Sequence, residues 1–445
     1  MAVDIHPPLA EVAHAEAPAT LNEAAPRTLT AYDQFGFWGN VGVSLLGFSG
    51  AIAILAPSGV PQLSFWAAVT AAIVGSALGG LILGASLVLG ARTGAPAMVL
   101  LRGLLGARAS FLPTVLNIAQ CLGWAIFELV TIALGLTSLT HGDVPRWLCI
   151  LAAGLVTTAL TIRPLGWIRA LRKYVSVLVV IALVVLAIGL LRHHGEQLGG
   201  SWKGFWLAVD SAMALTISWV PLGADYSRHS RSAKAAFAGG FAGYGLTQVA
   251  CLVIGLVALA QVGEDGNQIF SLFIGLPLGT IAFAVLVIRE TDQSFANVYS
   301  TAISLQNLRP SLDRRVLSVA LGVIITVLAL SINIYDYANF LYLIGAVFIP
   351  MSGALIAAWL RTRGEDWNIS IDAPLRPGML AAWLIGFAVY QVINPGTLAH
   401  WSGFWTRIGT DLHTLNHPWL SASIGSFVVS VLIALPFARP AKALR

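Results

Sequence analysis

An apolar stretch at residues 112–139 carries three side chains that could bind a flat, polar molecule. Trp124 and Glu128 are four residues apart, and Gln120 lies four residues before Trp124. On a helix, residues at this spacing share one face. An indole offers a surface for ring stacking, and a carboxylate accepts hydrogen bonds from ring N–H or amino groups. The pattern favours a site for a hydrogen-bonding heterocycle. The alternative is a packing tryptophan beside a protonated glutamate.

A second polar cluster lies in the apolar stretch 280–307. Its members fall within nine residues: Arg289, Glu290, Thr291, Asp292, Gln293 and Asn297. Charged groups inside an apolar helix are costly and usually serve a function. Asp292 follows Arg289 by three residues, so the spacing predicts an internal ion pair. A polar patch that only packs against partner helices is the alternative.

Two further apolar stretches contain helix-breaking residues. The first, 35–56, includes Gly47 and Ser49, and the sixth, 204–224, includes Thr216, Ser218 and Trp219 just before a Pro–Leu–Gly sequence. Interrupted helices at corresponding places in two halves of a chain point to a solute site at their breaks. Kinks that serve packing alone would give the same composition.

Composition places these stretches in a lipid bilayer. The chain has 445 residues, of which 57% are hydrophobic and 10% charged, and its mean hydropathy is +0.81. Soluble domains carry about 25% charged residues. This chain has too few charges for a water-soluble surface, which argues against a soluble enzyme, a nucleic-acid-binding module and a disordered protein. The net charge of +5 is therefore no sign of a nucleic-acid partner.

Hydropathy predicts twelve spanning helices in an all-α integral membrane protein, since about 20 apolar residues cross a bilayer. The expected spans are 35–56, 63–90, 112–139, 146–162, 174–191, 204–224, 236–261, 280–307, 316–333, 337–360, 378–394 and 419–437. A short helix is expected within 265–279. With the N-terminus inside, 20 of the 25 Lys and Arg residues fall on the inner side and four on the outer side. This asymmetry predicts a cell (inner) membrane protein with both termini cytoplasmic.

The interruptions of the first and sixth spans, five spans apart, predict a five-plus-five inverted repeat. The expected organisation is a cytoplasmic tail (1–34), a first repeat (35–191), a second repeat (204–360), two further helices (378–437) and a C-terminal tail (438–445). The three cysteines lie in apolar stretches and are expected to be inert. We find no metal-ligand spacing, hydrolytic triad or phosphate-binding loop. The chain is therefore not expected to be an enzyme.

Several segments resemble the nucleobase:cation symporter-1 family, which includes cytosine, purine and allantoin permeases and a hydantoin transporter. The matching segments are YDQFGFWGN (32–40), TGAPAMVLLRGLLGARASFLPTVLN (93–117), ADYSR (224–228) and NVYS (297–300). The resemblance runs from about Tyr32 to Tyr342 and is weaker beyond. It implies the same inverted-repeat fold, with two extra helices.

The resemblance also implies a substrate site between the broken first and sixth helices and the third and eighth. Trp124 corresponds to a tryptophan that stacks on substrate, and Glu128 stands where the hydantoin transporter has a hydrogen-bonding glutamine. Asn297 matches a substrate-contacting asparagine. Thr216 stands where the sixth helix usually offers an aromatic residue, and Trp219 is the nearest one. The full expected substrate-binding set is Trp124, Glu128, Gln120, Asn297, Gln293, Trp219, Ser218, Thr216, Gly47 and Ser49.

Sodium-coupled members of the family hold the ion with first-helix carbonyls and two eighth-helix hydroxyls. The corresponding positions are Val43 and Leu46 for the carbonyls, and Thr291 and Asp292 for the side chains. We therefore expect no organic cofactor, and a coupling ion that is sodium or, alternatively, a proton carried by an acidic side chain.

The leading hypothesis is a monomeric symporter that imports a nucleobase or related heterocycle by alternating access. The alternatives are a symporter of the same fold for hydantoin, allantoin or an amino acid, and a membrane enzyme or a transporter-like sensor. The residues assign no role to Asp210, Gln248 or Asp336.

Overall fold

The chain folds into long apolar helices that run side by side. The computed structural model describes residues 15–57, 59–192, 199–263, 268–331, 337–362, 364, 367–415, 417 and 419–438. Within these ranges the regular structure is helical, with two isolated β-bridges. Asp336, the first 14 residues and the last seven lie outside the described residues.

The helices of the first half follow the predicted spans closely. They are α2 (Ala31–Val41), α3 (Leu45–Gly50), α4 (Ile52–Leu55), α5 (Phe65–Thr93), α7 (Phe111–Leu139), α8 (Arg146–Ile162), α9 (Pro164–Ala170), η1 (Leu171–Val175) and α10 (Ser176–Leu191). The largest difference is in the fifth span, which begins at Pro164 rather than at residue 174. Proline has no N–H group to leave unpaired in the first turn of a helix. The fifth span can therefore begin at Pro164, before the apolar run.

The second half repeats this pattern. Its helices are α11 (Phe205–Ile217), α12 (Val220–Ser227), α13 (Ala233–Ala238), η2 (Gly239–Tyr244), α14 (Gly245–Val262), α16 (Gly279–Arg289), α17 (Thr291–Leu308), α18 (Arg314–Ser331) and α19 (Tyr337–Thr362). The remaining helices are α20 (Pro377–Ile393) and α22 (Ala422–Phe437), with α6 (Ala97–Leu105), α15 (Gln268–Gly275) and α21 (Trp401–Asp411) between spans. The short α15 lies within the predicted segment 265–279.

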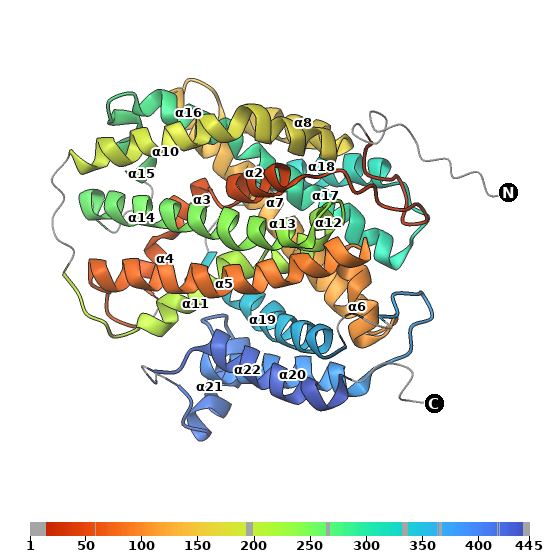
Figure 1. The fold of residues 1–445 in the computed structure, drawn as a ribbon. Coiled ribbons are helices and arrows are strands. Elements are labelled where there is room, and N and C mark those ends of the chain that lie inside the picture. Colours follow the sequence, from red (N-terminus) through yellow and green to blue (C-terminus); the bar gives the residue numbers. More distant parts are fainter. Residues whose placement is uncertain are drawn as a thin grey trace.

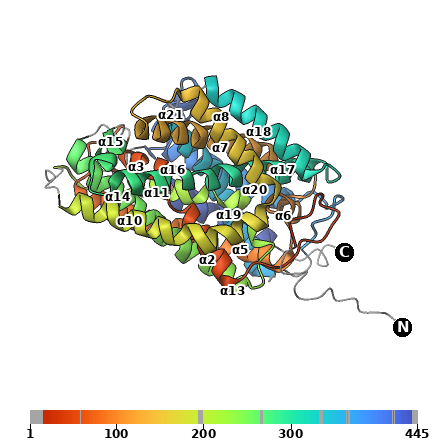
Figure 2. The ribbon, with the colours of Figure 1, turned by 90° about the horizontal axis from the view of Figure 1, so that it is seen from above.

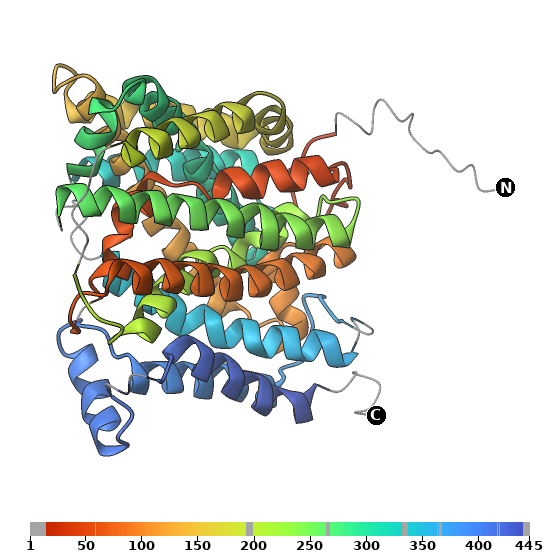
Figure 3. The same cartoon turned by 60° about the vertical axis from the view of Figure 1, so that its left-hand side comes forward.

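In the described residues, seven helices are long and apolar enough to cross a membrane, and the bent α2–α3–α4 pair makes an eighth. Three shorter apolar helices, α8, α20 and α22, and the joined α16 and α17 supply the rest of the expected spans. Figure 1 shows the helices lying roughly parallel. Figure 2 shows α8 and α18 running together, and Figure 3 shows α19, α20 and α22 layered at one edge.

Three spans are interrupted where the polar clusters of the sequence occur. The first bends by 51° between Val41 and Leu45. The sixth is interrupted at Ser218 and Trp219, between α11 and α12, although the two helices still form one 23-residue span. The eighth is interrupted at Glu290, between α16 and α17, which the sequence predicted as one helix. Each interruption frees backbone groups inside the bundle.

Asp210 on α11 joins the core to the last helix. Its carboxylate accepts hydrogen bonds from the Ser421 hydroxyl and from the backbone N–H groups of Ala422 and Ser423. These are the first, otherwise unpaired N–H groups of α22. The carboxylate therefore caps α22, a structural role that the sequence did not assign.

Residues 15–30, which we call the strap, lie across one end of the helices (Figure 1). Glu16 accepts from the N–H groups of Leu165 and Gly166, and the carbonyl of Ala19 accepts from Arg314 and Gln306. The sequence predicted a mobile tail over residues 1–34. In the described part of that tail, backbone groups make ordered contacts with several helix ends.

The far end of the strap is bound as well. Leu29 pairs with Ser230 in a β-bridge, and the carbonyl of Pro26 faces Nδ1 of His229 at 2.9 Å. Arg27 donates to the carbonyl of Arg92 at 2.9 Å. The strap thus connects the ends of the second, fifth, sixth, eighth and ninth spans.

Candidate functional site

A small cavity lies where the interrupted helices meet. Its volume is about 30 Å³, and about 10–15 Å³ is enough for one water molecule. Its walls come from the break in the first span and from α7, α11–α12, η2–α14 and α17. The lining residues that bear on function are Ser44, Gly47, Trp124, Glu128, Ser218, Trp219, Tyr244, Gln248, Cys251 and Gln293.

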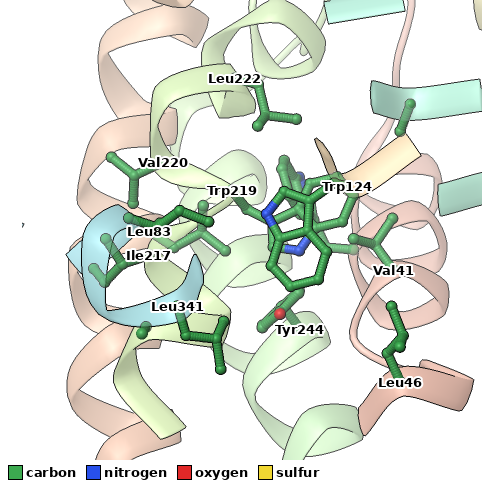
Figure 4. Packing of buried hydrophobic residues seen from close by; sticks show 14 of the residues in the cluster. Val41, Leu46, Leu83, Trp124, Ile217, Trp219, Val220, Leu222, Tyr244 and Leu341 are labelled. Atoms are coloured by element: carbon green, nitrogen blue, oxygen red, sulfur yellow. The ribbon is translucent and has the colours of Figure 1, made fainter. Parts of the chain in front are cut away.

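Two tryptophans from different spans line this cavity. Figure 4 shows Trp124 and Trp219 with Tyr244 beside them. Trp124 packs edge-on against Phe340, with ring centroids 5.3 Å apart. Trp219 packs edge-on against Trp38 at 6.2 Å. Because both indoles line the cavity, each can present aromatic surface to a ligand between α7 and α12.

The interruption of the sixth span is held by the third span. The side-chain amide of Gln120 donates to the carbonyl of Ser218 at 2.8 Å and to Oδ1 of Asn117 at 3.0 Å. The Ser218 hydroxyl in turn donates to the carbonyl of Leu215 at 2.7 Å. Gln120 therefore fixes the backbone just before Trp219.

The acidic side of the cavity is formed by Glu128. This residue is 1% exposed, and it shares the electrostatic neighbourhood of Arg289, Glu290 and Asp292. Arg289 pairs with Oε2 of Glu290 at 2.9 Å and with Oδ1 of Asp292 at 3.0 Å. The second of these contacts confirms the predicted pairing three residues apart.

Side chains of the eighth span reach the break in the first. Nε2 of Gln293 donates to the carbonyls of Val41 and Val43, both at 2.7 Å. Oε1 of Glu290 accepts from the Ser44 hydroxyl at 2.8 Å. Both carboxylate oxygens of Glu290 also accept from the N–H of Leu45, at 3.1 and 3.2 Å. The eighth span thus satisfies the backbone groups that the break leaves unpaired.

A cavity at the meeting point of broken helices is typical of solute carriers. Residues 23–373 match the model of a family described as permeases for cytosine/purines, uracil, thiamine and allantoin. The protein belongs to this permease family. The match covers most of the chain, so it extends well beyond the motifs that suggested it.

Solved structures show the same fold. The permease matches Mhp1, a nucleobase-cation-symport-1 family transporter, in a closed conformation with bromovinylhydantoin bound, with a TM-score of 0.74, 16% identity and coverage of 95% of this chain and 94% of that chain. Inward-facing Mhp1 matches with a TM-score of 0.67, 17% identity and coverage of 96% and 94%. A Na+-coupled sialic acid symporter matches with 0.55, 12% identity and coverage of 91% and 90%. No curated protein matches the sequence.

The structure brings six of the ten expected substrate-binding residues of the permease to the cavity. They are Trp124, Glu128, Gln293, Trp219, Ser218 and Gly47. Gln120 is not a lining residue, but it donates a hydrogen bond to the carbonyl of Ser218, which lines the cavity. The other three bond elsewhere: Asn297 donates to the carbonyl of Gln293, Thr216 to Oε1 of Gln248, and Ser49 to the carbonyl of Leu45.

Of the four residues expected to bind the cation, three have internal partners at the groups that would hold the ion. Val43 accepts from Gln293, Asp292 pairs with Arg289, and the Thr291 hydroxyl donates to the carbonyl of Ile288 at 2.8 Å. The fourth, Leu46, lines the cavity.

Four of the cavity residues named above were not expected there, and Ser44 at the break in the first span is one of them. Tyr244 and Cys251 come from the seventh span, which has no charged residue to draw attention to it. Gln248 was noticed as polar but received no role. Its amide donates to Ser76 and to the carbonyl of Ala212, which ties α14 to α5 and α11.

Proposed function

We propose that this permease is a secondary active transporter that imports a nucleobase or related heterocycle by cation symport and alternating access. Substrate binds in the cavity between the interrupted first and sixth spans and the third and eighth. The permease acts as a monomer in the cell (inner) membrane. Both termini are cytoplasmic, which agrees with the concentration of Lys and Arg on that side.

The observation that carries this proposal is the convergence of Trp124, Trp219 and Glu128 on one cavity. Two indoles from different spans offer their faces to a flat ring. The carboxyl group of Glu128 can form hydrogen bonds with the edge of that ring. An amino-acid site of this fold would need no such pair of aromatic walls.

The size of the cavity implies that binding and conformational change are coupled. At about 30 Å³ it holds little more than water. A heterocycle therefore enters only when the helices around it separate. Closure around the bound ring then buries it, as alternating access between the two repeats requires.

The carboxyl group narrows the substrate class. An ionised carboxylate accepts hydrogen bonds but cannot donate them. Glu128 therefore favours a ring edge rich in N–H and amino donors, such as that of an aminopyrimidine or guanine. A ring that presents only acceptors would leave a buried charge unsatisfied.

The test is a thermal-unfolding screen of the purified protein against cytosine, uracil, purines, allantoin, hydantoins and amino acids. A ligand that binds the folded state raises the melting temperature by mass action. Uptake of each stabilising compound is then measured in proteoliposomes. We expect a donor-rich heterocycle to give the largest shift and to be taken up. Stabilisation by an amino acid, with none by any heterocycle, would reject the substrate assignment and leave the fold intact.

A further inference from the structure

The break in the first span presents carbonyl oxygens of the kind that hold a cation in transporters with interrupted helices. In this protein those oxygens accept hydrogen bonds from the eighth span. Nη2 of Arg289 donates to the carbonyl of Asn40, and Gln293 donates to those of Val41 and Val43. Of the two carbonyls expected to hold a coupling metal ion, that of Val43 is thus taken by Gln293, and side chains also bind the neighbouring carbonyls of Asn40 and Val41.

Arg289 and Glu290 place opposite charges on the two sides of the break. The guanidinium contacts the last turn of α2, whose carbonyls carry partial negative charge, and Glu290 contacts the first N–H group of α3, which carries partial positive charge. The two residues are also paired with each other at 2.9 Å. Charged side chains of the protein itself therefore balance the partial charges of the backbone groups at the break.

The expected metal ligands on the eighth span are engaged in the same way. Asp292 lies 3.0 Å from the guanidinium of Arg289, and both side chains are fully buried. A sodium ion among these oxygens would sit beside a buried positive charge. Two like charges in a site with little water repel strongly, so the guanidinium and the ion exclude each other.

The buried carboxyl groups near the guanidinium of Arg289 are able to bind protons. The carboxyl groups of Glu290 and Asp292 pair with the guanidinium of Arg289. The carboxyl group of Glu128, which lines the cavity, lies in the electrostatic field of these three residues. From η2 and α14, Tyr244 and Cys251 line the same cavity. An excess of buried carboxylates is costly, and a proton on one of them relieves the repulsion. Glu128 is the carboxyl group that lines the cavity.

Resting on the proposed function, we propose that Arg289 is a resident cation in the place of a coupling metal ion. Uptake then requires no sodium, and the coupling ion is a proton carried by Glu128. Arg289 and Gln293 stay bonded to the carbonyls at the break in the first span throughout the transport cycle. In the loaded permease the protonated Glu128 keeps one carboxyl oxygen as an acceptor, so it still binds an N–H or amino group of the ring.

The first experiment needs no substrate. The melting temperature of the purified protein is measured in NaCl and in choline chloride at equal ionic strength. We expect no sodium-specific shift for the wild type, and a rise of about 2 °C or more for Arg289→Ala, whose vacated oxygens can take the ion. Arg289→Lys, which keeps the positive charge, should behave as the wild type.

Two results overturn this assignment. One is a sodium-specific rise in the wild type, which remains measurable even if Arg289→Ala does not fold. The other is a folded Arg289→Ala protein that gains no response to sodium. Gln293→Ala, which frees the carbonyls of Val41 and Val43 but keeps the guanidinium, is the matched control and should not respond to sodium.

The second experiment tests the proton. Proteoliposomes are assayed with whichever of cytosine, uracil, hypoxanthine or allantoin is taken up, under a pH gradient or a sodium gradient. We expect accumulation under the pH gradient alone, accompanied by proton entry reported by an internal pH dye. Glu128→Gln should lose proton entry and pH-driven accumulation, and any counterflow exchange that it retains should not depend on pH.

The outcomes separate this inference from the proposed function. Accumulation driven by sodium rejects the resident cation while supporting a heterocycle symporter. Retained pH-driven accumulation in Glu128→Gln, or exchange in this variant that still depends on pH, rejects Glu128 as the proton carrier. Absence of uptake for every heterocycle rejects the proposed function, whereas the sodium titration still decides the role of Arg289.

Discussion

The side chain of Gln120 donates to the carbonyl of Ser218 at 2.8 Å, so the third span holds the interruption of the sixth. Because Trp219 follows directly, this bond fixes one aromatic wall of the cavity relative to the other. A positioning residue of this kind should affect substrate affinity without contacting the substrate.

We predict that Gln120→Ala raises the KM for the transported heterocycle about tenfold, which corresponds to about 1.4 kcal/mol, the size of one buried hydrogen bond. Gln261→Ala is the matched control, since that side chain donates to the carbonyl of Leu190 at 3.0 Å away from the cavity. Uptake kinetics in proteoliposomes provide the measurement. Equal KM values for the two variants would contradict a positioning role.

Trp124→Ala should abolish uptake while the protein is still produced and inserted. The substitution removes a stacking surface, and it also costs about 3–5 kcal/mol of stability because it leaves a cavity. Trp124→Phe keeps an aromatic face and should retain partial uptake. Trp66→Ala, at a position 71% exposed, should transport normally. Normal uptake by Trp124→Ala would remove Trp124 from the site.

Asp210→Asn should destabilise the protein without changing which substrates it transports. The substitution weakens three hydrogen bonds to the start of α22, and bonds to a charged group are worth about 1.5–3 kcal/mol. A lowered melting temperature with unchanged KM is expected. Asp411→Asn, at an exposed position, is the control. A change in substrate preference would show that Asp210 does more than cap the helix.

His229, just beyond the sixth span, should make stability depend on pH. Burial and the positive charges of Arg228 and Arg314 hold its pKa well below the ordinary value. Below about pH 6.5 the unfolded chain binds a proton that the folded chain refuses, so this residue lowers the free energy of unfolding as pH falls, by up to about 1.4 kcal/mol per pH unit. Above that pH its contribution is constant.

His229→Gln removes this titration, so the difference in melting temperature between wild type and variant should shrink as pH falls from 7 to 5. The measurement is thermal unfolding of both proteins over that range. A difference that does not vary with pH would mean that the folded protein accepts the proton on His229.

The spans could be predicted from sequence because each is a run of apolar residues, and Lys and Arg are concentrated in the segments on one side of the membrane. The fourth span, 146–162, agrees at both ends with α8. Polarity inside apolar runs also located the cavity, since Trp124, Glu128 and Gln293 line it as expected. These signals are local in sequence, and the membrane makes them strong because buried polar groups there are costly.

Long-range partners were not predictable. The sequence identified Glu290 only as one charge in a cluster. Its hydrogen bonds to Ser44 and Leu45 join residues that are about 245 positions apart in the sequence. Thr216 was expected at the site, yet its hydroxyl faces Gln248 on a neighbouring helix. The ordered contacts of the strap could not be predicted from the sequence for another reason. Its contacts use backbone carbonyls, such as that of Ala19, and the pattern of side chains does not reveal these.

The strap has a consequence for how the chain is made. Its residues leave the ribosome long before Arg314, which donates to the carbonyls of Ala17 and Pro18. The strap must therefore wait while more than half of the chain is synthesised and inserted. Domains generally fold in the order of their synthesis, whereas here a segment that precedes the first span is fixed only after the start of the ninth has been made. Attachment of the strap would then mark a molecule whose second, fifth, sixth, eighth and ninth spans have come together.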